Sequence, residues 1–535
     1  MKWCAISTAL CLFLKVIEVS FKLLKSTLVI SVMTSISRIF GLIRDIVIGA
    51  FFGPGLGVDV FIVSFRIPNF LRRLFAEGGF SQAFVPVLSE YKEQRNDEDV
   101  QKLIDQTSAT LGLILFFITI IGVLISPILI MIFAPGFLND ASKSNLASDL
   151  LRITFPYIFF ISLTAFAGSI LNTYKNFAIP AFTPVLLNIS LIVCAIWLAP
   201  LLETPIKALA WAVLIAGLVQ LFFQAPFLLK INKFPKPSLN RDKDGVNRIL
   251  KLMVPILFAV SIVQINLLVD TLIASFLATG SISWLYFSDR LVEFPLGVFG
   301  IALATAVLPN LSEKHAQGSL EKFSNTLDWS MRCVCLITLP AALGLAMLAS
   351  PLLITLFQYK AFSQYDVFMT SYSLMAYAIG LPAFVFIKVL SAGFFSRQDT
   401  KTPVKIGIIA VATNFVLNII LVLLFNRINL GHVGLALATS LSAYLQAFLL
   451  FSKLKKIQVY QPRKKWLGFF MKIILALVVM GIVIIFGVTD ASVWFDWGVF
   501  RRTSNLILWV LLSMLSYFTL LWLVGLRLSS FRSTE

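Results

Sequence analysis

Long apolar stretches dominate this 535-residue chain and limit what it can fold into. A stretch of about 20 apolar residues is long enough to cross the hydrocarbon core of a bilayer as an α-helix. Such stretches recur fourteen times, at about residues 27–52, 59–88, 106–134, 149–172, 180–200, 207–229, 249–278, 283–309, 328–357, 367–395, 404–425, 433–452, 467–488 and 505–526. The sequence therefore predicts an all-α polytopic membrane protein with about fourteen transmembrane helices.

The composition excludes most other classes of protein. Apolar residues make up 59% of the chain and charged residues only 13%, with a mean hydropathy of +0.91. The net charge of +18 would suggest nucleic-acid binding in a water-soluble protein. In a membrane protein, much of this excess is expected in the loops that set the orientation of the chain. We therefore exclude a nucleic-acid partner and a soluble multidomain enzyme, and disfavour an outer-membrane β-barrel, whose strands alternate.

Lysine and arginine gather in the loops on one side of the predicted membrane. Loops that follow even-numbered stretches hold roughly 23 of them, whereas the other loops hold roughly 6. Because positively charged loops remain in the cytoplasm, both termini are predicted to be cytoplasmic. The segment Lys230–Arg248 is the clearest mid-chain linker, because it is basic, contains proline and is poor in apolar residues.

The chain also contains an internal repeat. Four segments in the first half recur in order in the second half, at offsets of 223 to 226 residues. Because six stretches separate the two copies, the halves share one orientation and are parallel repeats about an axis along the membrane normal. The matching segments are VPVLSE (Val85–Glu90) with LPNLSE (Leu308–Glu313), Leu171–Pro180 with Phe394–Pro403, Asp45–Gly53 with Asp270–Ala278, and Leu209–Phe223 with Leu435–Leu449.

These features predict five segments. Residues 1–20 form an N-terminal extension of unknown role, and residues 21–230 form the first six-helix repeat. A cytoplasmic basic linker occupies residues 231–248, and the second six-helix repeat occupies residues 249–453. Residues 454–535 contain two helices with no counterpart in the repeat, followed by a C-terminal tail.

Three arginines lie deep inside predicted spans. Arg38 and Arg44 are roughly 10 and 17 residues into the first stretch, and Arg290 lies inside the eighth. A charge inside a span costs several kcal/mol unless it lines water or finds a partner. Internal salt bridges would satisfy them, Arg38 with Asp45 or Asp59, and Arg290 with Asp289 or Glu293. The alternative is a cationic cavity shared by both halves, in which the planar guanidinium fork suits a phosphate or diphosphate.

A second group of polar residues lies in the C-terminal half. Asp270 is in the seventh stretch, Asn414 and Asn418 are one helical turn apart in the eleventh, and Thr439 is in the twelfth. Oxygen ligands from three helices could hold a hard cation, and a sodium ion is the only cofactor that the sequence suggests. Interhelical hydrogen bonding is the alternative.

Cysteine and histidine give no sign of a zinc site or of nucleophilic catalysis. The five cysteines lie in or beside apolar stretches, and Cys333 and Cys335 lack the further ligands that complete a zinc set. The two histidines, His315 and His432, are both expected in loops. No enzymatic activity is predicted.

Several segments resemble the MurJ/MviN family, the bacterial lipid II flippases of the multidrug/oligosaccharidyl-lipid/polysaccharide exporter superfamily. The resemblance runs from about Phe21 to the C-terminus. Its motifs are SRIFGLIRD (Ser37–Asp45), FRIPNFLRRLFAEGGFSQAFVPVLSEYK (Phe65–Lys92), YFSDRLVEFPLGVFGIALATAVLPNLS (Tyr286–Ser312) and SRQDTKTPVKI (Ser396–Ile406).

The resemblance implies a function and a set of site residues. The family moves the undecaprenyl-diphosphate-linked peptidoglycan precursor from the inner to the outer leaflet of the bacterial cytoplasmic membrane, so lipid II and membrane lipids are the expected partners. The family's cavity arginines fall on Arg38, Arg44, Arg72 and Arg290, and its acidic position falls on Asp59. Helices 13 and 14 form a groove for the lipid tail in family members, and some members have a sodium site on helices 7, 11 and 12.

We expect the two halves to alternate between inward-open and outward-open states around a fixed site. Two other functions fit the residues. One is a flippase for another polyprenyl-diphosphate-linked glycan, which the same cationic cavity could bind. The other is a membrane scaffold of cell-wall synthesis that transports nothing, for which buried arginines in both halves would have no evident use.

Overall fold

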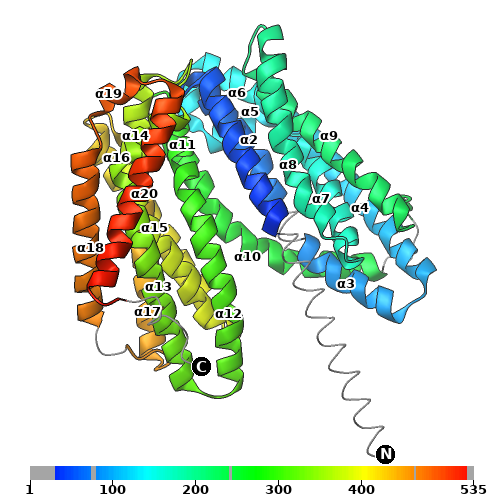
Figure 1. Cartoon of the computed structure of the whole chain (residues 1–535). Coiled ribbons are helices and arrows are strands. Elements are labelled where there is room, and N and C mark those ends of the chain that lie inside the picture. Colours follow the sequence, from blue (N-terminus) through cyan, green and yellow to red (C-terminus); the bar gives the residue numbers. More distant parts are fainter. Residues whose placement is uncertain (1–30, 74–79, 240–243, 463–465, 527–535) are drawn as a thin grey trace, which may run out of the picture. The chain divides into compact units, whose positions relative to one another are not determined.

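Helices make up every regular element in the described part of the computed structural model (Figure 1), which comprises residues 31–73, 80–239, 244–462 and 466–526. The predicted N-terminal extension, residues 1–20, lies outside these ranges. The chain forms two compact units by its contacts. The first contains residues up to Ile48, Val60–Ile132 and Asp140–Gln264, and the second contains Gly49–Asp59, Phe133–Asn139 and the chain from Ile265 onward.

The first unit takes its helices from the first half of the chain. A helix over the described residues 31–52 begins it, and α10 (Asp244–Ala274) passes from the first unit into the second. Between them lie α2 (Leu56–Arg72), α3 (Ser81–Gln94), α4 (Asp97–Leu124), α5 (Ser126–Phe133), α6 (Ala141–Thr154), α7 (Tyr157–Thr173), α8 (Ala178–Val193) with a π-helical extension (Cys194–Leu198), and α9 (Lys207–Lys230).

The second unit contains the remaining helices. They are α11 (Ser281–Pro295) and α12 (Ile301–Ala316), joined by a π-helical segment (Leu296–Gly300), then α13 (Leu320–Met347), α14 (Ala349–Leu356), α15 (Gln364–Phe395), α16 (Lys401–Asn426), α17 (Gly431–Lys456), α18 (Trp466–Gly487), α19 (Ala491–Asp496) and α20 (Val499–Leu523).

Eleven helical stretches in the described ranges are long and apolar enough to cross a membrane. They coincide with eleven of the fourteen predicted spans. The predicted spans at 27–52, 59–88 and 249–278 are not among the eleven, so the count of fourteen stays a prediction. The predicted span 59–88 overlaps α2 and α3, and residues 74–79 between them lie outside the described ranges. Helix α3 is amphipathic rather than apolar, with Phe84, Leu88 and Tyr91 buried and Glu93 exposed.

The predicted linker is bound to the first unit along α4. Lys233 is only 3% exposed, and its ammonium group donates to the carboxylate of Asp97. The backbone N–H of Lys236 donates to Asp105 Oδ1 at 2.8 Å, and Gln101 Nε2 donates to the carbonyl of Phe234 at 3.0 Å. The last five residues of the predicted linker are helical, because α10 begins at Asp244.

Small residues allow the closest helix contacts in the second unit. A Cβ at Gly434 of α17 would lie 2.7 Å from the carbonyl oxygen of Leu421 in α16, so only glycine permits this approach. Without a hydrophobic driving force between helices in lipid, such close packing and buried hydrogen bonds are what hold helices together. The hydroxyl of Ser440 accordingly donates to the carbonyl of Ala376, joining α17 to α15 at 2.7 Å.

The unrepeated hairpin of α18 and α20, which lie side by side (Figure 1), is attached to the second unit through a buried carboxylate near one end. Asp328 of α13 is 1% exposed. Its carboxylate accepts hydrogen bonds from Tyr460 Oη, Trp466 Nε1 and Arg332 Nε, each at 2.8 Å. Burial, and the phenol's own hydrogen bond to the charged Asp328 carboxylate, raise the pKa of Tyr460, so it stays a neutral donor.

A buried arginine attaches the hairpin near its other end. Arg502 of α20 is 6% exposed and donates only to backbone carbonyls among the described residues. They belong to Trp494 and Phe495 of α19, at 3.0 and 2.8 Å, and to Ile354 and Gln358 at the end of α14, both at 3.3 Å. Carbonyls at a helix C-terminus lack partners inside the helix and carry partial negative charge, so one guanidinium satisfies two helix ends.

Replacing Arg502 with leucine should destabilise the protein by about 3 kcal/mol, because several buried carbonyls lose a charged donor together. We expect a lower melting temperature in detergent and faster proteolysis in the loop between α18 and α20. The matched control is Arg501→Leu, since Arg501 is exposed and only stacks on Trp497. An Arg502→Leu protein as stable as the Arg501→Leu protein would contradict this role.

Candidate functional site

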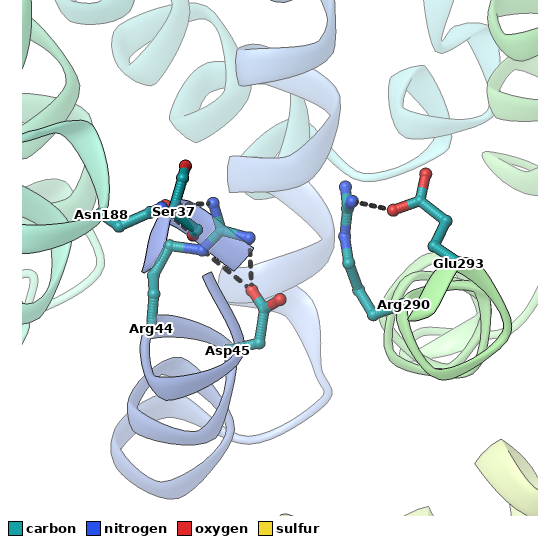
Figure 2. Close-up of polar contacts among 6 residues, drawn as sticks. All are labelled: Ser37, Arg44, Asp45, Asn188, Arg290 and Glu293. Atoms are coloured by element: carbon teal, nitrogen blue, oxygen red, sulfur yellow. Dashed lines mark hydrogen bonds and ion pairs between the residues drawn. The ribbon is translucent and has the colours of Figure 1, made fainter. Parts of the chain in front are cut away.

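Arg44 is held by two polar groups in the first unit (Figure 2). Its Nε and Nη2 donate to Asp45 Oδ1 at 2.9 and 2.7 Å, and its Nη1 donates to Asn188 Oδ1 of α8 at 2.9 Å. The Asn188 amide donates in turn to the carbonyl of Ser37 at 3.2 Å. The Asp45 side chain is 3% exposed and that of Arg44 is 14% exposed, so the guanidinium is the more accessible partner.

This geometry bears on the salt-bridge alternatives for Arg38. One of them paired Arg38 with Asp45, but in the described residues no ion pair joins these two, and Arg44 binds Asp45 instead. The spacing rule compares Cβ directions, whereas a long arginine side chain can fold back onto its neighbour. Asn188 was not anticipated at all. The available signal was an amide in the middle of an apolar helix, which usually seeks a polar partner.

Arg290 has a comparable arrangement on α11 in the second unit. Its guanidinium forms an ion pair with Glu293, one turn further along the helix, as one of the salt-bridge alternatives predicted. It also lies over the ring of Tyr286, 4.9 Å from the centroid. The Arg290 side chain is 32% exposed. Like Arg44, Arg290 is thus oriented by a carboxylate while part of its guanidinium stays accessible.

The other two predicted arginines are Arg38 and Arg72. Arg38 is half-buried and makes no hydrogen bond or ion pair with the residues that the structure describes. Arg72, in the last turn of α2, donates through Nε to Asn69 Oδ1 at 2.9 Å. Their role in substrate binding remains a prediction.

Asp59 occupies a structural position. Although it lies in the first turn of α2, its carboxylate binds the N-terminus of α11. Oδ2 accepts from the backbone N–H of Gly280 at 2.6 Å, and Oδ1 accepts from the N–H and hydroxyl of Ser283 at 2.8 and 2.5 Å. A carboxylate is favoured at this end of a helix by the free N–H groups and by the helix dipole. Asp59 is 4% exposed, so its oxygens serve the fold rather than an accessible surface.

The four residues predicted to hold a cation meet in the second unit. Asn418 Nδ2 donates to Asp270 Oδ1 at 2.7 Å and to Asn414 Oδ1 at 2.9 Å. Asn414 Nδ2 reaches Thr439 Oγ1 at 3.5 Å and Ser442 Oγ at 3.4 Å. Asn418 is fully buried, and its Oδ1 has no hydrogen-bond partner among the described residues. The Asn418 amide presents Nδ2 to the Asp270 carboxylate and to Asn414, so with this amide turned the gathered oxygens would fit a sodium ion.

Each repeat links a carboxylate to an asparagine, but through different contacts. Asp45 and Asp270 are equivalent at the offset of 225 residues, and each is linked to an asparagine of a later helix in its own repeat, α8 or α16. In the first repeat the link runs through Arg44, the residue before Asp45. The residue before Asp270 is Val269, so the second repeat has no arginine at this position.

Both histidines lie in helices, which corrects the prediction that they lie in loops. His315 belongs to the last turn of α12, and His432 to the first turn of α17. His432 is 1% exposed, with Nε2 3.1 Å from the carbonyl of Met369 and its ring 4.8 Å from that of Trp284. Within the described ranges, no three side chains of His, Cys, Asp or Glu cluster as metal ligands would.

Comparison with known proteins gives one consistent result. A family model described as "Lipid II flippase MurJ" matches residues 48–504. A probable lipid II flippase MurJ of Vibrio cholerae is 47% identical over 524 residues, covering 97% of this chain and 99% of that protein. The lipid II flippase MurJ of Burkholderia cenocepacia is 40% identical over 520 residues, covering 95% and 99%.

Solved structures agree with this result. A structure of lipid II flippase MurJ in an inward closed conformation matches with a TM-score of 0.77 and 28% identity, covering 92% of this chain and 98% of that one. An inward-facing transporter of the multidrug resistance MATE family matches with a TM-score of 0.64 and 15% identity, covering 81% and 98%. This second likeness concerns the fold alone.

Asp59→Ala should lower stability by about 3 kcal/mol, because three buried donors at the start of α11 lose their acceptor. Ser283→Ala, which removes one of the three donors, should cost about 1 kcal/mol. Melting temperature in detergent and hydrogen exchange of the first turn of α11 provide the measurements. If Asp59→Ala melts like the wild-type protein but no longer functions, Asp59 contacts substrate and its structural role is refuted.

Proposed function

The chain belongs to the lipid II flippase MurJ family, and from this membership we propose that it moves lipid II from the inner to the outer leaflet of the bacterial cytoplasmic membrane. The family is one of transporters rather than enzymes. The observation that carries the proposal is the match of nearly the whole chain, at 47% identity, to a relative named for this activity. The eleven apolar helices support the same conclusion, since the substrate is itself a membrane lipid.

We propose that Arg38, Arg44, Arg72 and Arg290 bind the diphosphate and the sugar-peptide head group. The support is chemical. Arg44 and Arg290 are each held by a carboxylate, which fixes the plane of the guanidinium fork before substrate arrives. A diphosphate offers several oxygens and more charge than one carboxylate, so it can compete with Asp45 or Glu293 for donors. Asp59 is the exception among the predicted site residues, because its oxygens bind α11.

The prenyl tail would remain in lipid while the head group crosses. Helices α18 and α20 present exposed apolar side chains along their length, including Ile474, Ile485, Leu511 and Leu515, which suits contact with a hydrocarbon chain. We propose that the halves alternate between inward-open and outward-open states, with both termini in the cytoplasm. A bound diphosphate would offset repulsion between arginines that approach each other, so substrate would favour closure.

We also propose that sodium binds at Asp270, Asn414, Asn418 and Thr439 and contributes to the transport cycle. The convergence of their polar atoms and the buried acceptor on Asn418 support this assignment. For sodium to bind, the Asn418 amide would turn its oxygen toward the ion. A proton on Asp270 is the alternative means of coupling transport to an ion gradient.

Two rival functions would leave different traces in cells. A flippase for another polyprenyl-diphosphate-linked glycan would, on depletion, cause that glycan's lipid intermediate to accumulate. A scaffold that transports nothing would cause no accumulation of a lipid-linked precursor in the inner leaflet. Identifying the lipid that accumulates after depletion separates the three functions.

Arg44→Ala and Arg290→Ala should each abolish complementation of a depletion strain, because the diphosphate loses a bidentate donor. Lysine at either position should restore only part of the function, since it keeps the charge and loses the fork. The matched control is Arg427→Ala, which removes an exposed arginine from the α16–α17 turn and should complement fully.

Loss of Arg44 alone leaves the buried Asp45 carboxylate without that partner, which could destabilise the protein. The double variant Arg44→Ala, Asp45→Asn removes both charges and should restore normal melting and membrane levels without restoring function. Full complementation by both single alanine variants would refute the proposed diphosphate site.

Sodium should raise the melting temperature of the purified wild-type protein more than potassium does at the same ionic strength. Asp270→Asn should remove this difference, because the site loses its formal charge. Asp490→Asn, which changes an exposed aspartate, is the control and should keep the sodium effect. Equal stabilisation of the wild-type protein by both salts would exclude the sodium site, and flattened pH dependence in Asp270→Asn would favour a proton.

A further inference from the structure

A small cavity of about 120 Å³ opens in the second unit where three turns meet. It is lined by Lys314 and Ser319 from the turn between α12 and α13, by Arg397 from the turn between α15 and α16, and by Val459 from the segment after α17. The distribution of lysine and arginine predicts that all three turns lie on the cytoplasmic side. We call this site the basic cavity.

The turn between α12 and α13 leaves a helix N-terminus open at the basic cavity. Gly318, at φ 68°, reverses the chain, and the N–H groups of Gly318 and Ser319 donate to the carbonyls of His315 and Lys314. These bonds satisfy the end of α12 in the manner of a Schellman motif. The first N–H groups of α13 lack partners inside the helix, and the Ser319 side chain does not cap them.

The side chains around this helix end carry net positive charge. The side chain of Arg397 makes no hydrogen bond or ion pair with described residues, and its Nε is buried without a partner. Lys314 lies 3.7 Å from Glu313, whose side chain is 58% exposed, so the pair neutralises little. Asp399, two residues from Arg397, is engaged elsewhere, because both its oxygens accept hydrogen bonds from Thr402. These bonds, with the charge of Arg397, hold the pKa of Asp399 below its usual range.

The equivalent place in the first repeat is filled by the protein itself. At the repeat offsets of 223 and 226 residues, Leu320 corresponds to Asp97, and Val459 corresponds to Lys233. The buried ammonium group of Lys233 donates to the Asp97 carboxylate there. In the second repeat both members of this ion pair are replaced by apolar residues that line the basic cavity.

The N-terminus of α4 in the first repeat is capped by its own side chains, whereas the N-terminus of α13 in the second repeat is not. Asn96, which corresponds to Ser319, caps its own helix by accepting from the N–H of Asp99 at 2.8 Å, and the first turn of α4 carries three acidic residues. The first turn of α13 carries only Glu321. The first repeat therefore supplies its own anion at this helix end, whereas the second leaves the helix end and its cations open.

We propose that the basic cavity binds a phosphate group, either of a phospholipid in the cytoplasmic leaflet or of a soluble compound in the cytosol. A tetrahedral oxyanion can accept from the guanidinium of Arg397, the ammonium of Lys314 and the first N–H groups of α13 at once. Val459, which lines the cavity and is only 3% exposed, excludes water from part of the site, which strengthens the electrostatic attraction. The proposal is independent of the transported substrate.

Binding can be followed by the melting temperature of the purified full chain in detergent. One probe is inorganic phosphate, with chloride at matched ionic strength as its control. The other is dioctanoyl phosphatidylglycerol, with dioctanoyl phosphatidylcholine as its control. We expect a phosphate probe to raise the melting temperature more than its control does. A response to phosphatidylglycerol alone identifies a lipid headgroup, and a response to inorganic phosphate alone identifies a soluble ligand.

Arg397→Ala should weaken the apparent affinity for the effective probe by about tenfold or more, the loss expected for a charged donor. Lys401→Ala removes an exposed cation four residues away and should bind like the wild-type protein. The double variant Leu320→Asp, Val459→Lys rebuilds the ion pair of the first repeat and should melt normally without responding to either probe.

Two results would overturn the proposal. One is that neither phosphate nor phosphatidylglycerol raises the melting temperature more than chloride or phosphatidylcholine does. The other is a shift that persists undiminished in Arg397→Ala and in the double variant, which would place phosphate binding elsewhere on the chain. Neither result bears on lipid II transport, so the basic cavity and the proposed function are tested separately.

Discussion

A charged side chain in an apolar medium costs free energy unless it finds a partner or water, and this cost explains the contacts of three deep charged residues. Arg44 binds Asp45 and Asn188, Asp59 binds the start of α11, and Arg502 binds carbonyls at two helix ends. Each of these groups joins elements far apart in the sequence. The interactions that neutralise these charges therefore also hold the helices against one another. The arginines available to a substrate are those whose guanidinium stays partly accessible.

Equivalent positions in the two repeats carry different side chains and make different contacts. At the carboxylate shared by both repeats, the first repeat carries Arg44 beside Asp45, whereas the second gathers oxygens around Asp270 and Asn418. On the predicted cytoplasmic side, Lys233 and Asp97 fill a place that is hollow and basic in the second repeat. Equivalent backbone positions thus hold an internal ion pair in one half and a candidate ligand site in the other.

The sequence predicted those features that depend on local pattern. Apolar length located the eleven helical stretches in the described ranges that are long enough to cross a membrane, and polar residues inside apolar stretches pointed to the group of Asp270, Asn414, Asn418 and Thr439. The sequence did not predict contacts that depend on side-chain conformation or that join distant segments. Nothing local links Asp59 to Gly280 or Arg502 to Ile354. One salt-bridge alternative named Arg38 as the partner of Asp45, whereas the structure pairs Asp45 with its neighbour Arg44.

The central claim is that this chain carries lipid II across a bilayer, and reconstitution tests it most directly. The purified protein is reconstituted in liposomes that carry fluorescent lipid II in both leaflets. The measured quantity is the fraction of lipid II that becomes accessible to a membrane-impermeant quencher or enzyme. The sodium gradient and the membrane potential are set independently. We predict that lipid II moves between leaflets faster than in protein-free liposomes, and that a lipid with the same tail but no diphosphate does not. Movement no faster than in protein-free liposomes under every gradient, with correctly folded protein, would contradict the account.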